Sequence, residues 1–446
     1  MPIEIFAVGG YGEVGKNMTA VKIDEEIVIF DMGLHLPNYI KFTEGEREDV
    51  VKLSADSLRR VQAVPDDRFV KKLKGKVVAI VPTHAHLDHI GAIPYLAEKY
   101  DAPVICTPFT AAVINSILRD EKIKIPNKII VLNPNSSIKL SKKMTLDFIN
   151  VTHSTPQTII ALLKTRHGNV IYANDFKFDD HPLIGKKPNY EALKEAGKEG
   201  VVAAIVDSLY AYDDRKTPCE GVAREMLRDV MLGVDNTKKA VIVTTFSSHI
   251  ARLNSIVEFG KQLGRKIVFL GRSLSKYASA AEDSQIAFFS KDVDITKFRK
   301  EAIKKLSDVM KQGKDKYLLV VTGHQGEPQA ILSRMANGST PFEFSSEDHV
   351  IFSSSTIPTP INIEQRRRLV DDLKGVGARV FTDIHVSGHA GREDLRDFIN
   401  MVKAEHLIPA HSEKKGIDGF VQLAEEMGYE KGKSVYPLRS GQSLVL

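Results

Sequence analysis

Three histidines and one aspartate occupy a single short segment, residues 83–89, and this segment limits the fold more than any other. It follows the apolar run 77–81, typical of a buried strand, and precedes residues 90–100, whose apolar side chains are spaced as in a helix. In extended chain alternate residues point the same way, so His84 and His86 can bind one ion. Asp88 and His89 lie past the bend and can bind a second. Neutral imidazole and carboxylate suit zinc.

The whole chain limits the class of protein. Its 446 residues exceed one ordinary core, so we expect two or three domains. The net charge of +5 permits a polyanionic substrate without requiring one. Cys106 and Cys219 lie far apart and exclude a disulfide framework, which favours a reducing compartment. Because we find no signal peptide and no apolar run of about 20 residues, we expect a cytoplasmic protein with no membrane partner.

A glycine-rich loop follows the first predicted strand, residues 3–8. Gly10, Gly12 and Gly15 match the dinucleotide-binding pattern G-x-G-x-x-G, which requires a helix directly after the loop. Residues 18–30 instead predict a β-hairpin. We therefore interpret the glycines as a tight loop that lines a site, with nucleotide binding as the less favoured alternative.

Further carboxylates and histidines lie where predicted strands end, and they are Asp31, His153, Asp175, Asp207 and His411. Any one carboxylate there can be an ordinary turn residue. Their repeated placement indicates a sheet sandwich whose edge loops converge. We predict that His84, His86 and His153 hold one ion, that Asp88, His89 and His411 hold a second, and that Asp175 bridges both. Two such ions suit hydrolysis of an ester, an amide or a phosphodiester.

A separate α/β domain is predicted after Asp207. Residues 240–245, 266–270 and 317–322 are strands separated by helical segments, as in a parallel sheet. Small polar donors fill its loops, and those we select as phosphate ligands are Ser247, His249, Ser353, Ser354 and Ser355. The alternative is that these residues only cap helices.

The remaining elements follow from apolar patterns. We predict helix near residues 50–61, a strand at 103–106, a helix at 110–118, a strand pair within 136–150, a strand at 379–383, a short strand before His411, a helix at 416–427 and a last strand pair.

Several motifs together resemble one known family. The segment HAHLDH at 84–89, with His153, Asp175 and the early Asp31, resembles the metallo-β-lactamase superfamily. The insert after Asp207 and its return through HVSGHA at 385–390 resemble the β-CASP branch. With GGYGEVGKNM at 9–18, DFKFD at 175–179 and TGHQGEP at 322–328, the chain resembles the ribonuclease J family, in a short, archaeal-type form.

This resemblance implies an α/β fold, an αββα metallo-β-lactamase sandwich with an inserted β-CASP domain. The domains are expected at 1–208, 209–372 and 373–446, with the first and third forming the sandwich. Two zinc ions per chain are implied, with manganese or magnesium as alternatives. Asp207 and His389 are expected to act in catalysis with Asp88. The loop expected to grip RNA consists of His385, Val386, Ser387, Gly388 and His389.

The implied function is 5′-to-3′ exoribonuclease action on single-stranded RNA, with a preference for 5′-monophosphate ends and with endonuclease activity as an addition. A homodimer is expected. An endoribonuclease of the polyadenylation-factor type, a small-molecule metallohydrolase of the same fold and a non-catalytic RNA-binding scaffold remain as alternatives. A small-molecule enzyme has no need of a second domain with phosphate-type loops.

Overall fold

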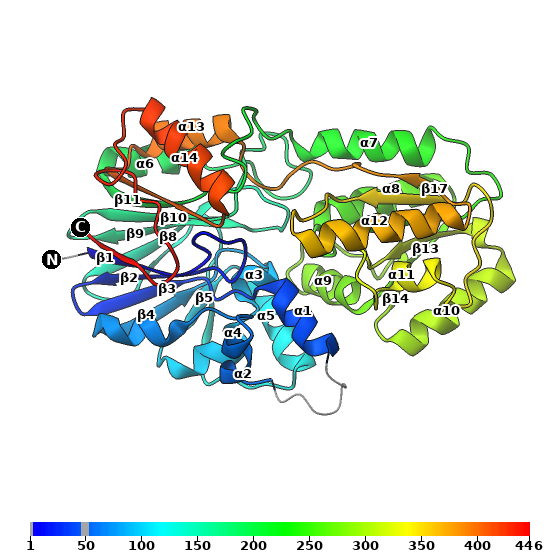
Figure 1. Cartoon of the computed structure of the whole chain (residues 1–446), viewed down its shortest axis with the longest axis horizontal. Coiled ribbons are helices and arrows are strands. Elements are labelled where there is room, and N and C mark those ends of the chain that lie inside the picture. Colours follow the sequence, from blue (N-terminus) through cyan, green and yellow to red (C-terminus); the bar gives the residue numbers. More distant parts are fainter. Residues whose placement is uncertain (1–2, 46–52) are drawn as a thin grey trace. The chain divides into compact units, whose positions relative to one another are not determined.

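The computed structural model describes residues 3–45 and 53–446, and the chain divides into two compact units (Figure 1). The first unit comprises Met1–Asp180, Lys186–Thr217 and Gly388–Leu446, and the second comprises His181–Gly185 and Pro218–Ser387. The sequence predicts the inserted domain at 209–372, whereas the main segment of the second unit runs from Pro218 to Ser387. Both observed boundaries therefore lie later in the chain than the predicted ones.

One hydrogen bond and one strand pairing explain why both boundaries differ from the predicted ones. The backbone N–H of Thr217 donates to Asp394, and both residues belong to the first unit, so residues 209–217 stay with that unit. At the other end, strand β17 (Arg379–Phe381) pairs with β16 (His349–Ser353) of the second unit's sheet. Residues 373–387 therefore belong to the second compact unit.

Two sheets pack face to face in the first unit. One sheet has the order β19-β1-β2-β3-β4-β5-β6 and the other β18-β11-β10-β9-β8-β7. The first consists of β1 (Ile3–Gly9), β2 (Met18–Ile23), β3 (Glu26–Phe30), β4 (Lys76–Val81), β5 (Val104–Cys106), β6 (Ile129–Val131) and β19 (Ser443–Val445). The second consists of β7 (Ser137–Lys139), β8 (Met144–Asn150), β9 (Ile159–Thr165), β10 (Asn169–Ala173), β11 (Val201–Asp207) and β18 (His406–Ala410).

Apolar side chains of both inner faces form one core, in which Val28 and Val81 lie with Phe148 and Ile205. Helices α6 (Tyr190–Glu199), α13 (Arg392–Val402) and α14 (Lys414–Glu426) cover the outer face of the second sheet (Figure 1). The first sheet is flanked by α1 (Leu36–Gly45), α2 (Ala55–Arg60), α3 (Leu87–Ile90), α4 (Ile93–Leu96) and α5 (Pro108–Asp120) (Figure 1). The short helix η1 (Asp67–Leu73) follows α2 in the chain, and η2 (Ala97–Lys99) follows α4. The expected αββα sandwich is confirmed.

The second unit is built on a parallel sheet of order β14-β13-β15-β12-β16-β17. Its other strands are β12 (Val241–Thr245), β13 (Lys266–Leu270), β14 (Val293–Thr296) and β15 (Tyr317–Val321). Its helices are α7 (Glu220–Leu232), α8 (Ile250–Gln262), α9 (Arg272–Asp283), α10 (Arg299–Gln312), η3 (Lys314–Lys316), α11 (Ile331–Ala336) and α12 (Pro360–Gly375). The predicted α/β class of this domain is therefore correct.

The continuous helix predicted at residues 90–100 is wrong. The segment forms α3, α4 and η2, because the backbone N–H of Ala92 donates to Met32 and so leaves the helical pattern. Pro94 has no backbone N–H, so it cannot donate a helical hydrogen bond to the preceding turn. The close packing that results holds the segment against the loop after β3.

Three smaller predictions have mixed outcomes. A strand, β2, follows the glycine loop where a dinucleotide site needs a helix, which contradicts nucleotide binding there. The predicted last strand pair is a single strand, β19, which pairs with β1 instead. Residues 50–52 of the expected helical stretch lie outside the described residues, and α2 lies in the rest.

Among the helices described, none is long and apolar enough to cross a membrane.

Candidate active site

Strand ends of the first unit bring the predicted metal ligands together. Each of them follows a strand or a strand-to-helix turn, and they are His84 and His86 after β4, Asp88 and His89 in α3, His153 after β8, Asp175 after β10 and His411 after β18. Strands β10, β11 and β18 are parallel neighbours, so their C-terminal ends meet at one edge of the sheet.

One group of four potential ligands consists of His84, His86, His153 and Asp175, whose ligand atoms lie within 4.8 Å of one another. His86 Nδ1 is 3.1 Å from His84 Nε2 and 3.2 Å from His153 Nε2. Tetrahedral zinc with ligands at about 2.0–2.1 Å places neighbouring ligand atoms about 3.3 Å apart. The spacing of these nitrogens therefore fits one such ion.

A second group consists of Asp88, His89, His411 and the same Asp175. His89 Nε2 lies 3.2 Å from Asp175 Oδ2, and His411 Nε2 lies 3.6 Å from Asp175 Oδ1. Asp175 is 1% exposed, and its Oδ1 has no hydrogen-bond partner among the described residues. A buried carboxylate oxygen without a partner is costly unless a cation is present, so the donor set fits a pair of divalent ions.

Burial sets the protonation of the first group. It lowers the pKa of His86 to about 4 and holds the pKa of His84 and of His153 well below the ordinary value. Imidazole binds metal in its neutral form. These three rings are therefore in the ligating form at neutral pH.

Asp31 orients the ring of His89 through a hydrogen bond to the ring nitrogen that is not aimed at the other potential ligands. Asp31 Oδ2 accepts hydrogen bonds from His89 Nδ1–H at 2.8 Å and from the Tyr172 hydroxyl at 3.0 Å, while its Oδ1 accepts from the backbone N–H of Thr83 at 2.8 Å. These bonds fix the ring so that Nε2 faces the metal groups. A carboxylate behind a ligating histidine is the usual outer partner of a metal site.

We expect Asp31→Asn to weaken metal binding by about 10- to 100-fold, because the amide no longer presents a charged acceptor to His89. Competition with a graded chelator measures this. Tyr172→Phe is the matched control, since it removes one hydrogen bond to Asp31 and leaves the bond to His89. Equal chelator sensitivity of Asp31→Asn and the unmodified protein would contradict this role.

Asn17 was not among the residues predicted for the site. Its Oδ1 accepts from His411 Nδ1–H at 2.9 Å, and its Nδ2 donates to the backbone oxygen of Asp88 at 3.0 Å. It thus links two residues of the second group. The only sequence signal was its place directly after the glycine loop, where Gly10 O accepts from the His411 backbone N–H at 2.7 Å.

Asp207 and His389 form a pair beside the shared carboxylate. His389 Nδ1–H donates to Asp207 Oδ2 at 2.7 Å, and His389 Nε2 lies 4.0 Å from Asp175 Oδ2. Burial opposes protonation of His389, but the charges of Asp207 and Asp175 outweigh it and raise its pKa to about 9. His389 is therefore an imidazolium at neutral pH and has a proton on each nitrogen.

The loops selected for RNA divide between the units. Gly388 and His389 belong to the first unit, and Gly388 O accepts from His153 Nδ1–H at 2.6 Å. The other selected residues belong to the second unit, and they are His385, Val386, Ser387, Ser247, His249, Ser353, Ser354 and Ser355.

Buried Arg252 anchors several of these second-unit loops. Its guanidinium pairs with Glu220 at 2.6 Å and 2.9 Å and donates to Ser353 Oγ at 2.8 Å and to the Ile384 backbone oxygen at 3.2 Å. His249 contacts the same Glu220 and accepts from the first turn of α8. Ser353 and His249 therefore hold the loops together. The hydroxyl of Ser354 is buried and finds no hydrogen-bond partner among the residues that the structure describes.

Comparisons with known proteins agree with this geometry. Family models match residues 56–189 as "Beta-lactamase superfamily domain", 238–373 as "Ribonuclease J, beta-CASP domain" and 375–436 as "Zn-dependent metallo-hydrolase RNA specificity domain". The chain is 44% identical to ribonuclease J of Methanocaldococcus jannaschii, over 100% of this chain and 99% of that protein. It is 41% identical to ribonuclease J of Pyrococcus abyssi, over 98% and 96%.

A solved structure extends the comparison to the fold. A protein of unknown function from Enterococcus faecalis V583 aligns with a TM-score of 0.66 at 18% identity, and the alignment covers 100% of both chains. At this identity the likeness shows that the two chains share a fold.

Proposed function

The chain belongs to the ribonuclease J family of metallo-β-lactamase nucleases, and from this premise we propose that it is a zinc-dependent 5′-to-3′ exoribonuclease. Its substrate would be single-stranded RNA with a 5′-monophosphate end, and endonuclease activity would be secondary. One observation carries the proposal: two groups of four potential ligands share the buried Asp175, whose Oδ1 has no hydrogen-bond partner in the part of the chain that the structure describes.

The seven residues predicted as ligands would hold two zinc ions, with manganese or magnesium as alternatives, and Asp175 would contact both. When bound, such a pair would lower the pKa of water and stabilise the negative charge that develops on the oxygens around phosphorus. Asp31 and Asn17 would keep the histidine rings oriented. Because the three rings of the first group are neutral at pH 7, no proton has to leave them when a cation binds.

Asp207 and His389 would supply the proton for the leaving group. Hydrolysis adds water to phosphorus and breaks the bond between phosphorus and the 3′ oxygen of the preceding nucleotide. His389 would donate from Nε2 to that oxygen while Nδ1–H stays bonded to Asp207. Asp88, besides its place in the second ligand group, would accept a proton from the attacking water.

Recognition of the 5′ end would fall to the loops of the second unit. The buried Ser354 hydroxyl has no hydrogen-bond partner within residues 3–45 and 53–446, and it would donate to a phosphate oxygen. Residues 385–387 lead without a break into Gly388 and His389, so the segment expected to grip RNA is continuous with the proton donor. We also propose a cytoplasmic homodimer. Both cysteines are free, which agrees with a reducing compartment.

The polarity is tested with one RNA labelled at either end and carrying a 5′-monophosphate or a 5′-triphosphate. We expect immediate release of labelled mononucleotide from the 5′-labelled monophosphate RNA, and much slower release from the triphosphate form, because a bulkier terminal group fits poorly. Ser354→Ala is expected to reduce this discrimination.

Two outcomes would favour the rival functions. Early internal fragments that do not depend on the 5′ group would replace the exonuclease by an endonuclease of the same family. Hydrolysis of small esters with intact RNA would indicate a small-molecule enzyme.

A further inference from the structure

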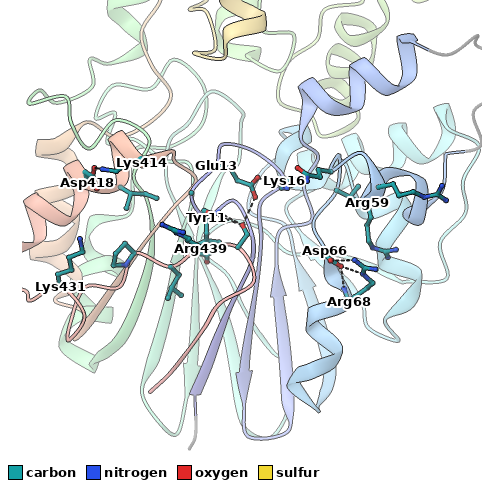
Figure 2. A pocket seen from close by; sticks show the side chains of 18 residues that line it. Tyr11, Glu13, Lys16, Arg59, Asp66, Arg68, Lys414, Asp418, Lys431 and Arg439 are labelled. Atoms are coloured by element: carbon teal, nitrogen blue, oxygen red, sulfur yellow. Dashed lines mark hydrogen bonds and ion pairs between the residues drawn. The ribbon is translucent and has the colours of Figure 1, made fainter.

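A pocket of about 930 Å³ lies in the first unit, and none of the predicted metal ligands lines it. Four chain segments form its wall: the glycine loop, residues 59–68, the first turn of α14 and residues 431–440. Figure 2 shows Lys414, Lys431 and Arg439 on one side of the glycine loop and Arg59 and Arg68 on the other. Positive side chains from distant parts of the sequence thus surround one space.

The positive charge of this pocket is only partly neutralised. Three of its cations have acidic partners within the wall, which are Lys16 with Glu13 at 3.1 Å, Arg68 with Asp66 at 2.7 Å, and Lys414 with Asp418. Arg59 pairs with Asp67 outside the wall at 2.8 Å. In the described part of the chain, Arg60, Lys431 and Arg439 have no ion-pair partner.

Three unpaired cations on two of these segments, Arg60 on one and Lys431 and Arg439 on the other, select the kind of ligand. Arg60, Lys431 and Arg439 are exposed to solvent, so an anion reaches them without displacing a carboxylate. Several unpaired cations around one space favour a ligand with several negative charges, such as a run of backbone phosphates. Tyr11, the one aromatic residue of the wall, is 3% exposed, so no ring is available for base stacking. The pocket therefore suits recognition of a backbone and not of bases.

The wall of the pocket is also joined to the candidate active site. The glycine loop accepts the backbone N–H of His411 through Gly10 O at 2.7 Å, and Lys414 follows His411 by one short turn. Asn17, at the end of the same loop, holds the ring of His411. A ligand in the pocket would contact the elements that support this potential metal ligand.

We propose that this pocket is an accessory RNA-binding site that holds backbone phosphates of a single strand, without base preference and apart from the metal groups. The proposal rests on the function proposed above, in that the ligand is RNA. The pocket strengthens the binding of RNA that is long enough to occupy the pocket and the active site together.

The test neutralises the three unpaired cations in the variant Arg60→Gln/Lys431→Gln/Arg439→Gln. Binding of a 20-nucleotide RNA with non-hydrolysable linkages is measured across a salt series, together with hydrolysis of a tetranucleotide. Lys124→Gln/Lys128→Gln/Lys142→Gln is the matched control, since it removes three exposed lysines of the first unit that lie outside the pocket. Inorganic phosphate and a mononucleotide serve as competitors.

We expect the slope of log K against log salt to become shallower by about 2, because each phosphate contact of a single strand contributes about 0.7. Affinity for the 20-mer should fall roughly tenfold at 50 mM salt. The control should keep the original slope, and all three proteins should hydrolyse the tetranucleotide equally.

Three results would overturn the pocket proposal: an unchanged slope in the pocket variant, an equal loss in the control variant, or competition by mononucleotide as strong as that by RNA. If the unmodified protein fails to hydrolyse the tetranucleotide at all, the proposed nuclease function fails instead. The salt slope still reports on the pocket in that case.

Discussion

Asp175→Ala is expected to remove both metal ions and to abolish RNA hydrolysis in the same step. Asp175 belongs to both ligand groups, and its Oδ1 and Oδ2 face different histidines. Without it each group keeps three ligands, but neither keeps the bridging carboxylate. We expect metal content to fall from two ions per chain to well below one, and turnover to fall about a thousandfold or more. Metal analysis of the purified variant and a labelled-RNA assay measure the two effects.

The matched control is Asp179→Ala. Asp179 is buried in the same segment at 2% exposure and belongs to none of the ligand groups among the described residues. It should cost folding stability, read as a lower melting temperature, while the metal content stays at two. A variant at Asp175 that retained two ions would show that the bridging assignment is wrong.

His389→Ala should lower turnover by about 10²- to 10⁴-fold while both ions stay bound, as expected for loss of a general acid. The reason is geometric: His389 Nδ1 is committed to Asp207 at 2.7 Å, and Nε2 is the atom left to serve the leaving oxygen. Single-turnover hydrolysis and metal analysis on the same preparation give both readouts. Loss of an ion from this variant would make His389 a ligand and not a proton donor.

Asp207→Asn separates the two members of the pair. Asp207 acts through His389 in this account, so the double variant should be no slower than His389→Ala alone. Additive losses would mean that Asp207 has its own role at the reacting group, or that it only supports the loop through its bond from the Leu209 backbone N–H.

The strands and the metal-ligand groups could be predicted from the sequence, because they depend on apolar periodicity and on the spacing of ligand residues. Buried runs such as β4 and β11 carry apolar residues almost throughout, and side chains at their ends have to gather at one sheet edge. The partition of ligands into two groups around Asp175 followed from the same argument, and the structure groups the same residues. The resemblance to ribonuclease J supplied the role of His389, which no spacing indicates.

What sequence could not supply was contact between distant segments. Asn17 reaches His411 across the fold, and an asparagine after a glycine loop carries no local sign of that contact. The break in the helix predicted at 90–100 has the same origin, because Ala92 N–H bonds to Met32 in a different segment. Likewise, β17 joins the second unit through pairing with β16, which local apolar pattern does not reveal.

The central claim is that a pair of zinc ions, held by seven residues of the first unit, is required for RNA hydrolysis. The most direct measurement strips the protein with a chelator and follows hydrolysis of 5′-monophosphate RNA as zinc is returned in known amounts. We expect activity to stay low up to one ion per chain and to rise to its full value as the zinc content approaches two. Full activity with one tightly bound ion, or with none, would contradict it.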